Sequence, residues 1–151
     1  MILCSIMKAL FLIMMLMIGV TSVISSTGAT DIQTTNGYVV TPGYDHKIVD
    51  GTSRYSGKIQ QGQWIWYSKY LFMGVRQLPV DLNWGSSSDS LTLTVSAPDA
   101  TLGPYHDGDD GRIDGRIYLV VSKSSGLTPG TWYFGVFGER VAGARSFTFN
   151  A

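Results

Sequence analysis

Apolar and polar residues alternate along several segments in the second half of the chain. The alternating segments are 90–96, 116–122, 131–137 and 147–149. Because successive side chains of a β-strand point to opposite faces, each segment predicts a strand with one buried face. No segment after residue 30 keeps the apolar spacing of an amphipathic helix for more than one turn. The chain is therefore predicted to be all-β.

Turn-forming residues separate these segments. Gly, Pro, Asp and Ser recur between them, as in 85–88, 97–99 and 129–130. Short strands divided by such turns are typical of an antiparallel β-sandwich or a barrel. Only 15% of the residues are charged, against about 25% in an average soluble domain. We therefore expect Ser and Thr to cover the outer faces of the strands.

The first 29 residues have the pattern of a secretory signal peptide. Lys8 precedes an uncharged apolar run over 9–20, and small or polar residues follow as far as Ala29. A retained membrane anchor is the alternative, but the apolar run falls short of the roughly 17 residues that a spanning helix needs at least. We expect cleavage after Ala29 and a secreted or cell-surface protein, which contacts a membrane only through residues 1–29 if they are not cleaved.

The remaining 122 residues suit a single domain with one core. Residues 30–56 are less patterned and are predicted to form an N-terminal arm with short strands. Residues 57–151 are predicted to form the sandwich. Cys4, the one cysteine, is lost with the signal peptide, so no internal disulfide is expected.

The composition also excludes several functions. Eleven basic residues balance eleven acidic ones without a basic cluster, which argues against a nucleic-acid partner. The chain has one Glu, two His (His46 and His106) and no Gly-x-Ser-x-Gly motif, so we predict no catalytic residues and no enzyme. A small secreted hydrolase that uses one of the two histidines is the alternative.

Four carboxylates and three glycines are concentrated between residues 107 and 115. Calcium takes six to eight oxygen ligands, and glycine-rich turns let neighbouring carboxylates converge on one ion. The sequence therefore predicts a Ca²⁺ site. The alternative is a solvated acidic hairpin loop, partly neutralised by Arg112 and Arg116. The predicted ligands are Asp107, Asp109, Asp110 and Asp114.

Aromatic residues are dense in 64–67 and 132–134. They form either a sandwich core or an exposed platform for a polysaccharide or a protein fibre, and core positions are the commoner place for such residues. We expect Trp64 and Trp66 to point inward together with Trp132. Tyr67 and Tyr133 fall on the faces opposite these tryptophans, and both are predicted as exposed ligand-binding residues.

From residue 57 onward the order of motifs resembles the pre-peptidase C-terminal (PPC) domain family, which is related to bacterial collagen-binding domains. The best match is Leu127-Thr128-Pro129-Gly130-Thr131-Trp132-Tyr133, which resembles the entry to a late strand of that family. Two departures are Thr92, where a second acidic residue is common, and Ala100, where glycine is usual. The other matching segments are 57–63, 80–84, 89–95, 97–100 and 147–149.

The resemblance implies a jelly-roll-like sandwich that binds or spaces rather than catalyses, in a family where some members bind calcium and some bind collagen. The prediction is thus an exported, non-catalytic β-sandwich with a binding or structural role at the cell surface. Its expected partner is an extracellular protein or polysaccharide. The alternative is a self-assembling structural subunit of the cell envelope.

Overall fold

The computed structural model describes residues 33–43 and 54–151, and the regular structure in these ranges consists of β-strands. In this part of the chain no helix is long and apolar enough to cross a membrane. The predicted signal peptide and residues 44–53 of the predicted arm lie outside the described residues. The strands are β1 (Gln33–Thr35), β2 (Tyr38–Pro42), β3 (Arg54–Gln60), β4 (Trp64–Leu71), β5 (Gln77–Asn83), β6 (Ser90–Ala97), β7 (Ala100–Tyr105), β8 (Arg116–Lys123), β9 (Gly130–Arg140) and β10 (Ala144–Asn150).

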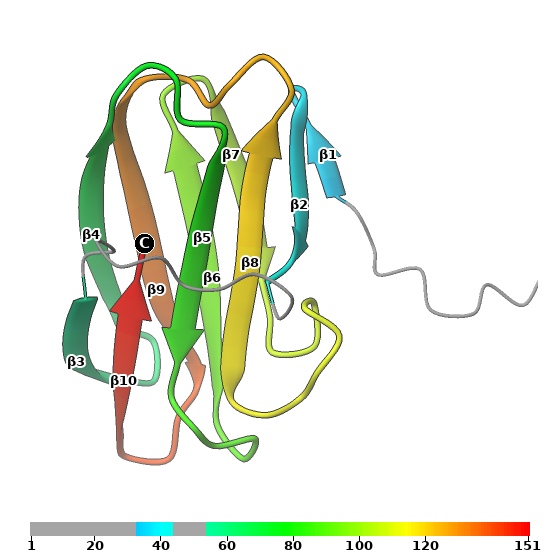
Figure 1. Ribbon diagram of the computed structural model, residues 1–151. Coiled ribbons are helices and arrows are strands. Elements are labelled where there is room, and N and C mark those ends of the chain that lie inside the picture. The colour runs from blue at the N-terminus through cyan, green and yellow to red at the C-terminus, as the bar shows by residue number, and fades with distance from the viewer. Residues whose placement is uncertain (1–32, 44–53) are drawn as a thin grey trace, which may run out of the picture.

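The strands form two antiparallel sheets that pack face to face (Figure 1). A six-stranded sheet has the order β1-β2-β8-β5-β10-β3, and a four-stranded sheet has the order β4-β9-β6-β7. From β3 onward every connection crosses between the sheets except the β6–β7 hairpin. Two interleaved Greek keys of this kind make a jelly roll. The predicted all-β, jelly-roll-like sandwich is confirmed.

The core is made by the alternating segments. Leu91, Leu93 and Val95 of β6 are fully or almost fully buried, as the alternation predicts. Burial of each such side chain contributes about 1.5–3 kcal/mol, so these rows hold the two sheets together. The inward residues of β8 and β9 complete the same cluster: Ile117, Leu119, Val121, Trp132, Phe134 and Val136.

Residues 33–43 of the predicted arm also belong to the six-stranded sheet. β2 pairs with β8 and places Tyr38 and Val40 in the core. The ring of Tyr38 meets that of Trp132 edge-on, with centroids 5.6 Å apart. This segment therefore packs on the sandwich.

A polar network fastens β2 to the turn between β6 and β7. The Tyr38 hydroxyl donates to Asp99 Oδ1 at 2.5 Å, and Lys123 Nζ lies 2.9 Å from Asp99 Oδ2. The Thr128 hydroxyl donates to the same carboxylate at 2.9 Å. Partial burial works to raise the pKa of Asp99. The hydrogen bonds from Tyr38, Lys123 and Thr128 outweigh that effect and lower its pKa from 3.8 to about 2.

A pH-dependent stability follows from the lowered pKa of Asp99. The contribution of the Asp99 carboxylate to the free energy of unfolding is complete above about pH 4. It is lost as the pH falls through about 2, because Asp99 in the folded state then binds a proton. We expect Asp99→Asn to be less stable than the wild type at neutral pH. The gap in urea midpoint between the two proteins should narrow between about pH 4 and pH 2. A gap that stays constant over this range would contradict the assignment.

Candidate functional site

The outer face of the four-stranded sheet carries a group of exposed aromatic side chains on β4 and β9. The exposed fractions are 45% for Trp64, 53% for Trp66, 57% for Tyr70 and 50% for Tyr133. Together with the partly exposed Phe137, these residues are called the aromatic face below. Monomeric proteins rarely expose contiguous apolar patches of large side chains unless the patch has a partner.

The two exposed tryptophans are ordered by each other and by β9. Their rings stack with centroids 5.3 Å apart at an interplanar angle of 14°, and the Trp64 ring also packs on Phe137 at 4.8 Å. Opposite Trp66 on β9 is Gly135. A β-carbon at residue 135 would lie 2.7 Å from Cη2 of Trp66 and 3.0 Å from Cζ3 of Trp64. The glycine thus leaves the space over β9 that both indoles occupy.

Beyond Trp66 the face opens at Ser68. Ser68 is the next outward residue of β4, and directly across from it on β9 is Tyr133. Tyr70 follows on β4, with its ring 5.0 Å from that of the exposed Phe72. Aromatic rings therefore stand on either side of a small hydroxyl residue.

No charged side chain interrupts this face. The outward residues of β4 between 64 and 70, of β9 between 131 and 137, and of β6 between 92 and 96 are all neutral. Lys69 of β4 turns inward, where its Nζ donates to the backbone oxygen of Ala151 at 2.7 Å, and burial lowers the pKa of its ammonium group. A ligand of this face therefore meets rings and hydroxyl groups.

The predicted direction of the β4 aromatics is wrong. Trp64 and Trp66 point outward, because β4 pairs with β9 in a register that sets Ile65 opposite Val136 and Tyr67 opposite Phe134. Directly opposed residues of paired strands share one face, so the buried residues of β9 fix which half of β4 is buried. The sequence of β4 alone leaves this choice open, because both of its faces are rich in apolar residues.

The two predicted ligand-binding tyrosines have different environments. Tyr133 is exposed and belongs to the aromatic face. Tyr67 is half-buried and packs on the core, with its ring stacked on that of Phe149 at 5.0 Å and tilted against that of Tyr55 at 4.6 Å. Burial raises the pKa of the Tyr67 phenol. The expected exposure is thus found for Tyr133 and not for Tyr67.

The carboxylates of the acidic loop bond to the loop's own backbone. Asp107 accepts the N–H groups of Asp114, Gly115 and Arg116 at 3.0–3.3 Å. Asp109 accepts the N–H of His106 at 2.8 Å. Backbone amides therefore offset the repulsion between the clustered carboxylates. The position of these carboxylates in one loop requires neither a bound ion nor a splayed loop.

Asp110 is the buried member of this loop, with 2% of its surface exposed. It accepts the N–H of Arg112 at 3.1 Å and that of Tyr118 at 2.9 Å. Over the described ranges, no group of three or more His, Cys, Asp or Glu side chains is placed to hold a metal ion. Calcium binding by Asp107, Asp109, Asp110 and Asp114 stays a prediction.

Replacing Asp110 with alanine tests the structural role of the loop. We expect a loss of about 1–3 kcal/mol in the free energy of unfolding for each buried amide left without an acceptor. Thermal melts of wild type and variant, with calcium and then with chelator, separate this role from metal binding. Equal melting temperatures of the wild type in both solutions would contradict the calcium prediction, and an unaffected Asp110→Ala variant would contradict the structural role.

His106 lies beside two carboxylates on the surface. Its Nδ1 is 3.6 Å from Asp109 Oδ2, and its Nε2 is 3.5 Å from Glu139 Oε1. The nearby Ser90 hydroxyl donates to Glu139 at 2.6 Å rather than to the imidazole. A hydrolytic triad requires a hydroxyl that is hydrogen-bonded to the histidine. Here the serine hydroxyl bonds to the glutamate, so these three residues differ from a triad. His46 lies outside the described residues.

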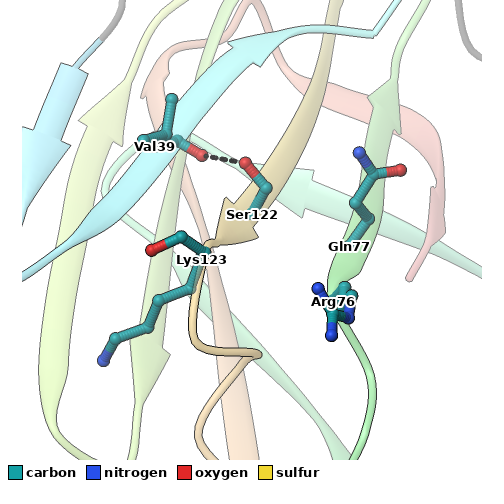
Figure 2. Close-up of a pocket in the computed structure, with 6 residues that line it drawn as sticks. Val39, Arg76, Gln77, Ser122 and Lys123 are labelled. Carbon is teal, nitrogen blue, oxygen red and sulfur yellow. Dashed lines mark hydrogen bonds between the residues drawn. The ribbon is translucent and has the colours of Figure 1, made fainter.

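An open pocket of about 570 Å³ lies on the other sheet, where β2, β5 and β8 adjoin. Figure 2 shows Val39, Ser122, Lys123, Arg76 and Gln77 around it, with the Ser122 hydroxyl donating to the carbonyl of Val39. Lys123 is engaged by Asp99 and by the ring of Tyr38, 4.1 Å away. Its cation therefore already has partners within the fold.

Comparisons with known proteins give a distant likeness among solved structures. No protein-family model matches the chain, and no curated protein is significantly similar to it. Among solved structures, the chain is similar to PliG of Aeromonas hydrophila, a periplasmic inhibitor of g-type lysozyme. The two are 18% identical over 69% of this chain and 89% of that one, with a TM-score of 0.41. A likeness this distant carries no conclusion about ligand or site.

Proposed function

We propose that the chain is an exported, non-catalytic binding module that attaches to an extracellular polymer through its aromatic face. The observation that carries the proposal is the ordered Trp64–Trp66 pair, half exposed above Gly135 on an uncharged part of the outer sheet face. Aromatic side chains that are rigid and exposed lose little conformational entropy on binding and bury a large area. The pattern of residues 1–29 supports export to a secreted or cell-surface location.

Membership of the PPC family is part of the same proposal. The loop that carries the best-matching motif leads into β9, which contributes Trp132 to the core and Tyr133 to the aromatic face. A binding or spacing role fits that family and needs no catalytic group. A structural calcium in the acidic loop is a separate proposal, tested by the thermal melts described above.

The experiment is co-sedimentation of the purified protein with insoluble polysaccharides and with fibrous proteins. We expect the wild type to sediment with a polymer and Trp66→Ala to stay in the supernatant. Ile113→Ala is the matched control, because Ile113 is 75% exposed and lies in the acidic loop after β7, which is at the opposite edge of the sheet from β4. Sedimentation that is equal for wild type and Trp66→Ala would contradict the proposal.

A self-assembling envelope subunit is the second candidate, and one observation favours it. β4 lies at one edge of its sheet, so the outer backbone groups of the strand that carries three of the exposed aromatics pair with no other strand in the described part of the chain. Exposed edges of this kind pair readily with other strands. Under the binding proposal, light scattering during size exclusion gives a monomer at every concentration. A mass that grows with concentration and is reduced by Trp66→Ala would support assembly instead.

A further inference from the structure

The register of the four-stranded sheet aligns hydroxyl groups in one row across all of its strands. Tyr133 of β9 pairs with Ser68 of β4 on one side and with Ser96 of β6 on the other. Ser96 in turn pairs with Thr101 of β7. Opposed residues point to the same face, so the four side chains form one row on the outside, called the hydroxyl row below.

The hydroxyl row begins between aromatic rings. Trp66 precedes Ser68 on β4 and Tyr70 follows it, both more than half exposed. Strand spacing of about 4.8 Å gives the row a length of roughly 14 Å, which is longer than a single sugar ring. Ser68, Tyr133 and Thr101 are exposed, and Ser96 is half-buried. The surface thus combines ring faces at one end with hydroxyl donors and acceptors along its whole length.

We infer that this surface binds a neutral glycan chain, which crosses the strands along the hydroxyl row and places a sugar on the ring of Trp66 at the β4 end of the row. The inference rests on the proposed function and names its ligand class. A pyranose ring has an apolar face of C–H groups and a rim of hydroxyls, so the rings accept its face and the hydroxyl row bonds its rim.

The absence of charge selects this ligand over other polymers. Nucleic acids and sulfated or carboxylated glycans require cations along their path, and the outward residues of β4, β9 and β6 in this region supply none. A second copy of the chain would bury the rings, but the hydroxyl row would then have to form its hydrogen bonds with an identical face. A neutral glycan provides partners for both parts of the surface.

The test is isothermal titration of the purified protein with two neutral series of two to six sugars, the β-1,4-linked oligomers of glucose and of N-acetylglucosamine. We expect affinity to rise with length until the row is filled and Trp66→Ala to remove binding. Ser96→Ala should weaken binding about two- to tenfold through one lost hydrogen bond. Ser125→Ala, an exposed serine in the turn after β8, is the matched control and should bind as the wild type does.

The outcomes separate this inference from the proposed function. Binding of a fibrous protein or of a charged glycan such as polygalacturonate through Trp66, with no affinity for either neutral series, overturns the glycan inference and leaves the binding module. Binding of a neutral series that Ser96→Ala does not change also overturns the path along the row. Affinity for no polymer of any class, or association of the chain with itself through Trp66, overturns both.

Discussion

Simultaneous replacement of Trp64 and Trp66 by alanine is expected to weaken polymer binding at least about 30-fold, the effect of losing roughly 2 kcal/mol or more at a binding hot spot. The two indoles stack on each other and supply much of the exposed apolar area of the aromatic face. Tryptophans in such positions contribute a large share of binding energy because a ligand removes their faces from water.

The same double variant should fold normally. Both side chains are about half exposed, and substitutions at exposed positions change the free energy of unfolding by less than about 1 kcal/mol in most cases. Titration measures the affinity of the double variant for the polymer, and urea unfolding of the same preparations measures its free energy of unfolding. A variant that unfolds early would show that the pair stabilises the sheet, and unchanged affinity in a folded variant would contradict a role in binding.

Replacement of Trp132 by alanine, unlike the double variant, should destabilise the fold. Trp132 has no exposed surface, its Nε1–H donates to the Thr128 carbonyl at 2.9 Å, and its ring packs against Tyr38. We expect the free energy of unfolding to fall by about 3–5 kcal/mol, because a large cavity opens between β9 and β2.

Urea unfolding measures this loss, and Trp132→Phe is the conservative control. Phenylalanine keeps an aromatic ring in the core but lacks the indole N–H, so its loss should be clearly smaller than that of alanine. A loss below about 1 kcal/mol for Trp132→Ala would contradict the buried position of this residue. Comparison of the Trp132 variants with the Trp64 and Trp66 variants separates tryptophans that stabilise the sandwich from those that bind the polymer.

Alternation predicted the strands that lie inside the sheets. The residues of β6, β8 and β9 that the alternation predicts as buried are buried, and Tyr118 and Val120 on the other face of β8 and Thr92 on the other face of β6 are buried as well. β4 is different because it has aromatic residues on both faces, so its direction depends on the partner strand. A sequence signal for the correct direction exists in Gly135, whose missing side chain makes room for the indoles of the opposite strand.

The polar parts of the site depend on register, which a single strand does not contain. Ser68, Ser96 and Thr101 are far apart in the sequence and adjoin only because β4, β9, β6 and β7 pair as they do. The acidic loop shows the same limit. The density of carboxylates is visible in the sequence, but the backbone amides that bond to Asp107 and Asp110 are set by the fold of the loop.

Quenching of tryptophan fluorescence by acrylamide reports directly whether a polymer covers the aromatic face, because only two of the four tryptophans are exposed. Trp64 and Trp66 are open to solvent, whereas Trp84 and Trp132 are 5% and 0% exposed. If the aromatic face binds the polymer, a saturating soluble ligand lowers the quenching of the wild type to that of Trp64→Ala/Trp66→Ala. Binding that leaves the quenching of the wild type unchanged would place the ligand elsewhere and contradict the account.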